Sequence, residues 1–229
     1  AIELLADVED KKTINVLVDY NLGVAFLHIR KYDKAVEYFL KVLSVDSNDR
    51  DANFNLANSY KYQGRLDEAI KVYNELIAKD QKDYESSFNL GICQLLRGNF
   101  IDGLQLYENR FNLKNNYCYS FNVSGNCLLQ SKNASRDSVI LVLYEQGFGD
   151  SINFSVYLNL LRKRFKKVIC VVQEELTTLF NSSFDCEIIS DYKDAPLYDY
   201  YIFIASLPLY FLESEKTFSS KTPYLNVPR

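Results

Sequence analysis

The sequence contains no tryptophan, no methionine and a single histidine, His28, among 229 residues. One histidine excludes a metal site built from several histidines and most catalysis that depends on an imidazole. We predict that His28 lies in the last turn of a helix, where a basic or polar side chain suits the carbonyl end. Since even the initiator methionine is absent, we expect the chain to be part of a longer gene product.

Charge and hydropathy exclude further classes of protein. The 26 basic and 30 acidic residues leave a net charge of −4, which argues against a protein that coats nucleic acid or anionic lipid. The longest apolar stretch, residues 197–212, is interrupted by Asp199 and Pro208 and is too short to span a bilayer. With 48% hydrophobic and 24% charged residues, the composition is typical of a packed, soluble chain.

Cysteine usage indicates a reducing compartment. The five cysteines form no CxxC pair and their number is odd. We therefore expect reduced thiols in a cytoplasmic protein, and no metal site. Cys118 and Cys127 are near enough in sequence for a disulfide, but no pattern supports one.

The first half of the chain repeats itself at a period of 34 residues. The segment Tyr20-Asn21-Leu22-Gly23 aligns with residues 54–57 and 88–91, and each period holds two apolar stripes of helical spacing. Further along, a small residue recurs at Ala35, Ala69 and Gly103. A large aromatic residue recurs at Phe39, Tyr73 and Tyr107. We predict helix pairs, with small residues where helices approach closely and aromatic rings filling the gap to the next pair.

These marks resemble the tetratricopeptide repeat, in which helix pairs stack into a superhelix with a concave face. The resemblance places an array at residues 1–111, with full repeats beginning near residues 16, 50 and 84. Residues 1–13 are similar to the end of the second helix of an earlier repeat. The first helix of each pair is expected to line the concave face.

Asparagine recurs at one position of the repeat, at Asn21, Asn55 and Asn89. On the concave face, such a ladder can hold an extended peptide or partner protein by its backbone, because each side chain offers a donor and an acceptor. The alternative is a hydrogen bond between helices of the array, since each asparagine lies close to the small residue at a helix contact. The sequence leaves both roles open.

Beyond residue 111 the helical period is lost. We predict a junction at residues 112–138 and an α/β domain at residues 139–229. Apolar runs predict strands at residues 139–144, 168–172, 186–189 and 200–205, with helices at residues 151–164, 174–181 and 207–212. The alternation predicts a parallel sheet, so the expected fold class is an α-helical repeat array followed by a Rossmann-like α/β half-domain.

A glycine-rich turn, Gln146-Gly147-Phe148-Gly149-Asp150, follows the first predicted strand. In a parallel sheet such a turn lies at the edge where ligands bind, and glycine permits tight backbone geometry and a close approach of the ligand. The third glycine of the dinucleotide fingerprint is absent. Asp150 is either the N-cap of the next helix or a base whose carboxylate faces a cleft.

The turn and its surroundings resemble a family of bacterial tetratricopeptide-repeat glycosyltransferases. Residues 145–157 are similar to its signature EQGxGD(T/S)IxFxRY, and residues 107–111 are similar to YEWRW. Later marks follow in order, at Asp199, at Ser206-Leu207-Pro208 and at Pro223-Tyr224-Leu225. Three positions depart from the family pattern, namely Asn109, Phe111 and Val156.

The resemblance implies that residues 139–229 are the N-terminal lobe of a two-lobed, heptosyltransferase-like GT-B fold. It implies inverting transfer of a sugar from a nucleotide-sugar donor to a protein or glycan acceptor, without a metal or other cofactor. Asp150 would be the general base, and Gln146, Gly147, Phe148 and Gly149 would contact substrate. Most donor contacts would come from a second lobe, so we expect residues 1–229 alone to be inactive. The alternative is a non-catalytic repeat scaffold that binds partner proteins.

Overall fold

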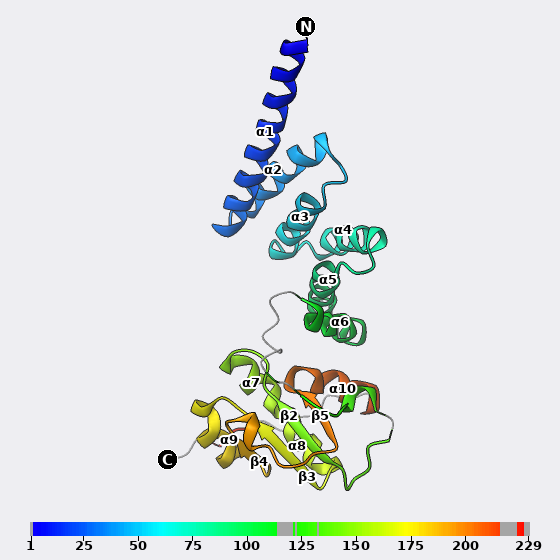
Figure 1. Cartoon of the computed structure of the whole chain (residues 1–229), viewed down its shortest axis with the longest axis vertical. Helices are drawn as coiled ribbons and strands as arrows, with labels where there is room; N and C mark the ends of the chain where they lie inside the picture. The colour runs from blue at the N-terminus through cyan, green and yellow to red at the C-terminus, as the bar shows by residue number, and fades with distance from the viewer. Residues whose placement is uncertain (1, 114–120, 122, 132, 216–223, 227–229) are drawn as a thin grey trace. The chain divides into compact units, whose positions relative to one another are not determined.

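A computed structural model of the chain describes residues 2–113, 121, 123–131, 133–215 and 224–226 (Figure 1). The chain divides into two compact units, Ala1–Leu113 and Lys114–Arg229. The described part of the first unit is built from helices. These are α1 (Ile2–His28), α2 (Tyr32–Val45), α3 (Arg50–Tyr62), α4 (Leu66–Lys79), α5 (Tyr84–Leu96), α6 (Phe100–Tyr107) and a 3-10 helix at Glu108–Asn112.

The helix boundaries repeat with the sequence. Asp49 and Asp83, which are 34 residues apart, cap α3 and α5 by accepting hydrogen bonds from the amides of Ala52 and Ser86 at 2.8 and 3.0 Å. Polar turns at residues 30–31, 63–65 and 97–99 separate the two helices of each pair, and His28 ends α1 as expected.

The packing inside the array follows the predicted pattern of small and aromatic residues. Phe39 and Tyr73 are fully buried. A Cβ added at Gly91 would lie 2.9 Å from the carbonyl oxygen of Gly103, and one added at Gly23 would lie 2.7 Å from the ring of Phe39. The small residues therefore permit helix contacts that a side chain would prevent. Tyr107, by contrast, is only half-buried.

The start of the array differs from the prediction. Residues 1–13 were expected to belong to a separate second helix of an earlier repeat, but α1 runs without a break from Ile2 to His28. In the next repeat the chain leaves the helix at Asp46, whose backbone is extended, and the next helix is capped by Asp49. Residues 13–15 (Thr-Ile-Asn) contain neither glycine nor proline, so nothing in their backbone chemistry forces such a break.

The second unit contains a five-stranded parallel sheet in the order β1-β5-β2-β3-β4. Its strands are β1 (Asn126–Cys127), β2 (Val139–Leu143), β3 (Lys167–Val171), β4 (Glu187–Ile189) and β5 (Tyr200–Phe203). Its α-helices are α7 (Phe148–Phe154), α8 (Leu158–Arg164), α9 (Thr177–Ser183) and α10 (Leu207–Glu215).

The central strands are buried on both faces, as their continuous apolar runs predict. Along β2, Ile140 and Val142 join one hydrophobic cluster, whereas Leu141 and Leu143 join another. Successive side chains of a strand point to opposite faces, so these two clusters lie on the two sides of the sheet.

Two details of the second unit escaped the sequence analysis. The helix expected at residues 151–164 is divided into α7 and α8 by a 3-10 turn at Ser155–Tyr157. The junction expected at residues 112–138 contributes β1, which pairs with β5 and forms one edge of the sheet. A strand of two residues carries no period that a sequence could reveal.

Candidate functional site

The three repeated asparagines lie on the first helices α1, α3 and α5, and each amide group donates a hydrogen bond within the array. The Nδ2 atoms of Asn21 and Asn89 donate to carbonyl oxygens one turn earlier, at 2.8 and 2.9 Å. Asn55 donates instead to the hydroxyl oxygen of Tyr20 on α1, at 3.1 Å. In the described part of the chain no donor contacts the Oδ1 atoms of Asn21 and Asn55.

Lys61 adds a cation to this row of first helices. Its ammonium donates to Oδ1 of Asn89 on α5 at 2.5 Å and lies 4.8 Å from the ring centre of Tyr62. Burial lowers the pKa of the Lys61 amine. The 34-residue alignment offers no hint of this residue, because Leu27 and Leu95 occupy the equivalent positions.

The glycine-rich turn follows β2 at the carboxyl edge of the sheet, as predicted, but Asp150 is not the helix cap. The N-cap of α7 is Gly147, and Asp150 lies in the first helical turn. The helix begins three residues earlier than Asp150 requires for capping, which corrects the N-cap interpretation. Of the two roles predicted for Asp150, the general base stays a prediction.

The two glycines of the turn do not need their conformational freedom. Gly147 has φ −73°, and Gly149 is not among the described residues with positive φ. A Cβ at either position would meet nothing within 4 Å. The tight geometry expected here is therefore absent, and a Cβ would fit at both positions. Phe148 between them is 47% exposed.

Asp150 has an electrostatic environment that favours its neutral form. Burial, and then the negative charge of Glu145, raise the pKa of the Asp150 carboxyl above its usual value. Glu145 is itself buried and accepts a hydrogen bond from the amide of Ala205 at 3.0 Å. A raised pKa makes a carboxylate a stronger proton acceptor at neutral pH.

Gln173, just beyond β3, holds the turn in place and was missed in the sequence. Its Nε2 donates to the carbonyl oxygen of Gln146 at 2.8 Å, and its Oε1 accepts from the hydroxyl of Ser151 at 2.9 Å. One amide side chain thus joins both ends of the turn. No local pattern marks this glutamine, because its partners lie 22 and 27 residues away.

The later family marks have structural contacts. The carboxylate of Asp199 accepts a hydrogen bond from the amide of Val139 at 2.7 Å, which ties the start of β2 to the start of β5. Tyr224 donates through its hydroxyl to the carbonyl oxygen of Ile152 in α7 at 3.2 Å. Pro223 and Cys118 lie outside the described residues.

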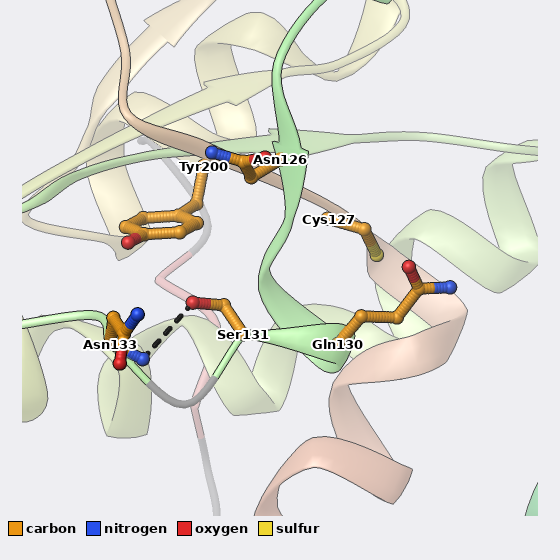
Figure 2. Close-up of a pocket in the computed structure, with 6 residues that line it drawn as sticks. All are labelled: Asn126, Cys127, Gln130, Ser131, Asn133 and Tyr200. Carbon is orange, nitrogen blue, oxygen red and sulfur yellow. Dashed lines mark hydrogen bonds between the residues drawn. The ribbon is translucent and has the colours of Figure 1, made fainter.

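A polar pocket of about 550 Å³ lies beside β1 and β5 (Figure 2). Its described lining consists of amide, hydroxyl and thiol groups from Asn126, Cys127, Gln130, Ser131, Asn133 and Tyr200. Tyr200 pairs with Ile140 near the start of β2, and none of the turn residues lines the pocket. This hollow is therefore separate from the turn and was not anticipated in the sequence.

Other classes of site are not found among the described residues. No group of three or more His, Cys, Asp or Glu side chains there could hold a metal ion. None of the described helices is long and apolar enough to cross a membrane. Cys93, Cys170 and Cys186 are free thiols.

Comparison with known protein families identifies the class of the first unit. The tetratricopeptide repeat matches residues 26–90. The helices within residues 26–90 are therefore tetratricopeptide repeats, as the 34-residue period predicts. The comparison with curated proteins gave no match.

Solved structures of repeat proteins are similar to part of the chain. MamA is 20% identical, with a TM-score of 0.41 over 48% of this chain and 64% of that chain. The Sgt2 repeat domain from Aspergillus fumigatus is 19% identical, with a TM-score of 0.39 over 41% and 62%. The first repeat domain of Spaghetti (RPAP3), bound to the HSP90 peptide SRMEEVD, is 19% identical, with a TM-score of 0.41 over 44% and 79%. The chain thus spans less than two thirds of the first two structures.

Proposed function

We propose that the repeat array binds an extended segment of a partner protein along its first helices, with Asn21, Asn55 and Asn89 in contact with the bound backbone. One observation carries this proposal. The Nδ2 bonds of Asn21 and Asn55 orient each amide, while their Oδ1 acceptors receive no donor from the described chain. Such acceptors can bond the backbone N–H groups of an extended peptide without disturbing the array.

Asn89 contributes differently, because its Oδ1 is already bonded by Lys61. At this end of the row the ammonium supplies donors rather than acceptors. The proposed surface therefore offers acceptors on α1 and α3 and donors near α5. This arrangement matches a peptide backbone, which presents both kinds of group.

Peptide selection tests the proposal. A phage library of 12-residue peptides is selected on the whole chain, and a selected peptide is labelled and titrated by fluorescence anisotropy. Asn21→Ala and Asn55→Ala should each weaken binding about 5- to 10-fold, the value of one hydrogen bond. Asn74→Ala, on the exposed side of α4, is the matched control and should bind as the wild type does. Selection of no peptide, or equal affinity in all variants, would contradict the proposal.

A second candidate function is sugar transfer at the glycine-rich turn, with the α/β unit as the N-terminal lobe of a GT-B fold. The observation that favours it is the raised pKa of Asp150 beside the buried Glu145. In this role Asp150 removes the proton from an acceptor hydroxyl, and residues 146–149 line the acceptor. The donor is a nucleotide sugar and the acceptor is a protein or a glycan. We place this reaction in the cytoplasm, since Cys93, Cys170 and Cys186 are free thiols.

The test of the second candidate is a transfer assay on the complete gene product with UDP-, GDP- and ADP-linked sugars. Asp150→Asn should lower the transfer rate at least about 100-fold, the usual effect of removing a general base. Asn153→Ala, an exposed change on the same helix, should leave the rate unchanged. A transfer rate that Asp150→Asn does not alter would exclude the base role, and it would leave the peptide-binding proposal intact.

A further inference from the structure

One wall of the polar pocket beside β1 is a fixed part of the second unit. Five of its six described lining residues lie between residues 126 and 133, and the sixth belongs to β5. Leu128 in the same segment is fully buried in the core of the unit. The amide of Ser131 donates to the carbonyl oxygen of Leu128 at 3.1 Å, and the amide of Asn133 donates to the Ser131 hydroxyl at 3.2 Å. The pocket is therefore built on the core and the edge of the sheet.

The aromatic ring of Tyr200 forms another part of the lining. Tyr200 is the first residue of β5, is half-buried, and packs against the hydrophobic cluster that contains Leu128 and Ile140. Its backbone pairs on both sides, with Asn126 of β1 and Ile140 of β2. The ring is thus held by its neighbours and gives the pocket a flat apolar surface.

No charged side chain is found in the described lining of the pocket. The lining offers side-chain amides from Asn126, Gln130 and Asn133 and hydroxyl groups from Ser131 and Tyr200. A carboxylate or phosphate ligand would need a cation there, and a cationic ligand would need an anion or several aromatic rings. The lining therefore favours an uncharged ligand that is rich in hydrogen-bonding groups.

Most of these polar groups are available to a ligand. No hydrogen bond joins the side-chain amides of Asn126, Gln130 and Asn133 to another residue in the described part of the chain. The same holds for the hydroxyl group of Tyr200. The Ser131 hydroxyl accepts one hydrogen bond and can still donate its own hydrogen. Amides and hydroxyls offer both donors and acceptors, so the pocket suits a ligand whose groups are also of both kinds.

The pocket is long enough to have two ends. In Figure 2 the ring of Tyr200 lies on the side of Ser131 and Asn133, whereas Gln130 and Cys127 lie together on the other side. The volume of about 550 Å³ is within the range of about 300–1,000 Å³ that small-molecule sites have. A ligand of two rings can therefore place one ring beside Tyr200 and the other toward Gln130.

We propose that this pocket binds a neutral saccharide. One sugar ring packs its C–H face on Tyr200, and Asn133 and Ser131 bond its hydroxyl groups. The amides of Asn126 and Gln130 bond the second sugar ring. This binding is independent of both functions proposed above, because the described lining contains no residue of the repeat array or of the glycine-rich turn.

A saccharide fits this lining better than a nucleoside does. A flat base is held best between apolar surfaces on both of its faces, and the described lining supplies one aromatic ring. A sugar carries hydroxyl groups around its rim and so can use amides and hydroxyls on several sides. Uridine is therefore a suitable competing probe.

Titration followed by heteronuclear NMR tests the proposal on the whole isotope-labelled chain. The probes are the neutral disaccharides cellobiose, lactose and N,N′-diacetylchitobiose, together with uridine. At least one disaccharide should shift the amide signals of Asn126, Ser131 and Tyr200 with a millimolar Kd, and uridine should leave them in place. A serine peptide that carries the bound disaccharide then separates two sources of the ligand. Tighter binding of this peptide identifies a protein-linked glycan, and equal or weaker binding identifies a free sugar.

Two substitutions locate the binding. Asn133→Ala removes one exposed amide and should weaken binding about 5-fold, the value of one hydrogen bond. Tyr200→Leu keeps an apolar side chain in β5 but removes the ring, and should weaken binding about 10-fold. Asn159→Ala, an exposed change on α8, is the control and should bind as the wild type does.

Circular dichroism checks that the variants are folded, and Asn133→Ala, a surface change, decides alone if Tyr200→Leu is not. Three results would each overturn the proposal. These are the absence of shifts with all three disaccharides, an affinity that Asn133→Ala leaves unchanged, and tighter binding of uridine than of any disaccharide.

Discussion

At the scale of single residues, the turn between the two helices of each repeat shows one strained position. Gly64 and Gly98 adopt φ +76° and +86°, and the equivalent residue of the first repeat is Arg30, with φ 58°. This left-handed conformation suits glycine but brings the Cβ of other residues too close to the backbone. The Arg30 side chain is exposed and makes no hydrogen bond within the described residues, so its contacts do not offset the strain.

Arg30→Gly is therefore expected to stabilise the first unit. We expect a gain of about 0.5–1 kcal/mol in the free energy of unfolding, because relief of backbone strain exceeds the added freedom of the unfolded chain. Urea denaturation followed by circular dichroism measures it. The reverse change, Gly98→Ala, should cost about 1 kcal/mol, since a Cβ there meets no atom within 4 Å and only the backbone opposes it. Equal stability of all three proteins would show that φ carries no strain here.

At the scale of elements, Asp83 joins two first helices. It caps α5 through Ser86, and its two carboxylate oxygens also accept hydrogen bonds from Arg50 at the start of α3, at 2.7 and 3.2 Å. Asp49 caps α3 in the same way but makes no such ion pair among the described contacts. The two aspartates thus separate the effect of a cap from the effect of a link between repeats.

Asp83→Ala should cost about 2–3 kcal/mol of unfolding free energy and Asp49→Ala about 1 kcal/mol, because only the first also breaks a partly buried charged contact. Burial alone would raise the pKa of Asp83, but the hydrogen bonds from Arg50 and Ser86 lower it below its usual value. The stabilisation is then present above the unfolded-state pKa and is lost as the pH falls through the folded-state pKa. Denaturation series between pH 7 and 3 should show wild type and Asp83→Ala converging below pH about 4. A constant difference across this range would be inconsistent with the ion pair.

At the scale of the whole molecule, the two units have separate hydrophobic cores. The clusters around Phe39 and Tyr73 contain residues of the first unit alone, and the clusters on the two sides of the sheet contain residues of the second. Each unit has more than 110 residues, which is enough to fold by itself. We therefore expect unfolding in two steps rather than one.

Scanning calorimetry should resolve two transitions that respond to different substitutions. Asp83→Ala should lower the midpoint of one transition, and Asp199→Ala should lower the other by a few degrees, because it removes the bond to Val139 at the edge of β2. If either substitution moved both midpoints together, the units would be coupled in unfolding.

The elements could largely be predicted from the sequence, and the site only in part. The turns at residues 30–31, 63–65 and 97–99 and the buried strand β2 follow from local spacing of apolar and polar residues. The glycine-rich turn was placed correctly after β2, yet the capping role considered for Asp150 was wrong. A cap depends on where the helix starts, and a shift of a few residues in that start changes the role of every residue in the turn.

By itself, the sequence determined the repeated helix pairs and the parallel sheet, because helical and strand periods are local properties of the chain. Only the tertiary structure decided which polar groups meet. Gln173 spans the turn, Asn55 bonds Tyr20, and Lys61 takes the acceptor of Asn89. It also decided that α1 continues where later repeats turn, and that residues 126–127 form a sheet edge. These contacts join residues more than 20 positions apart, so packing rather than local pattern selects them.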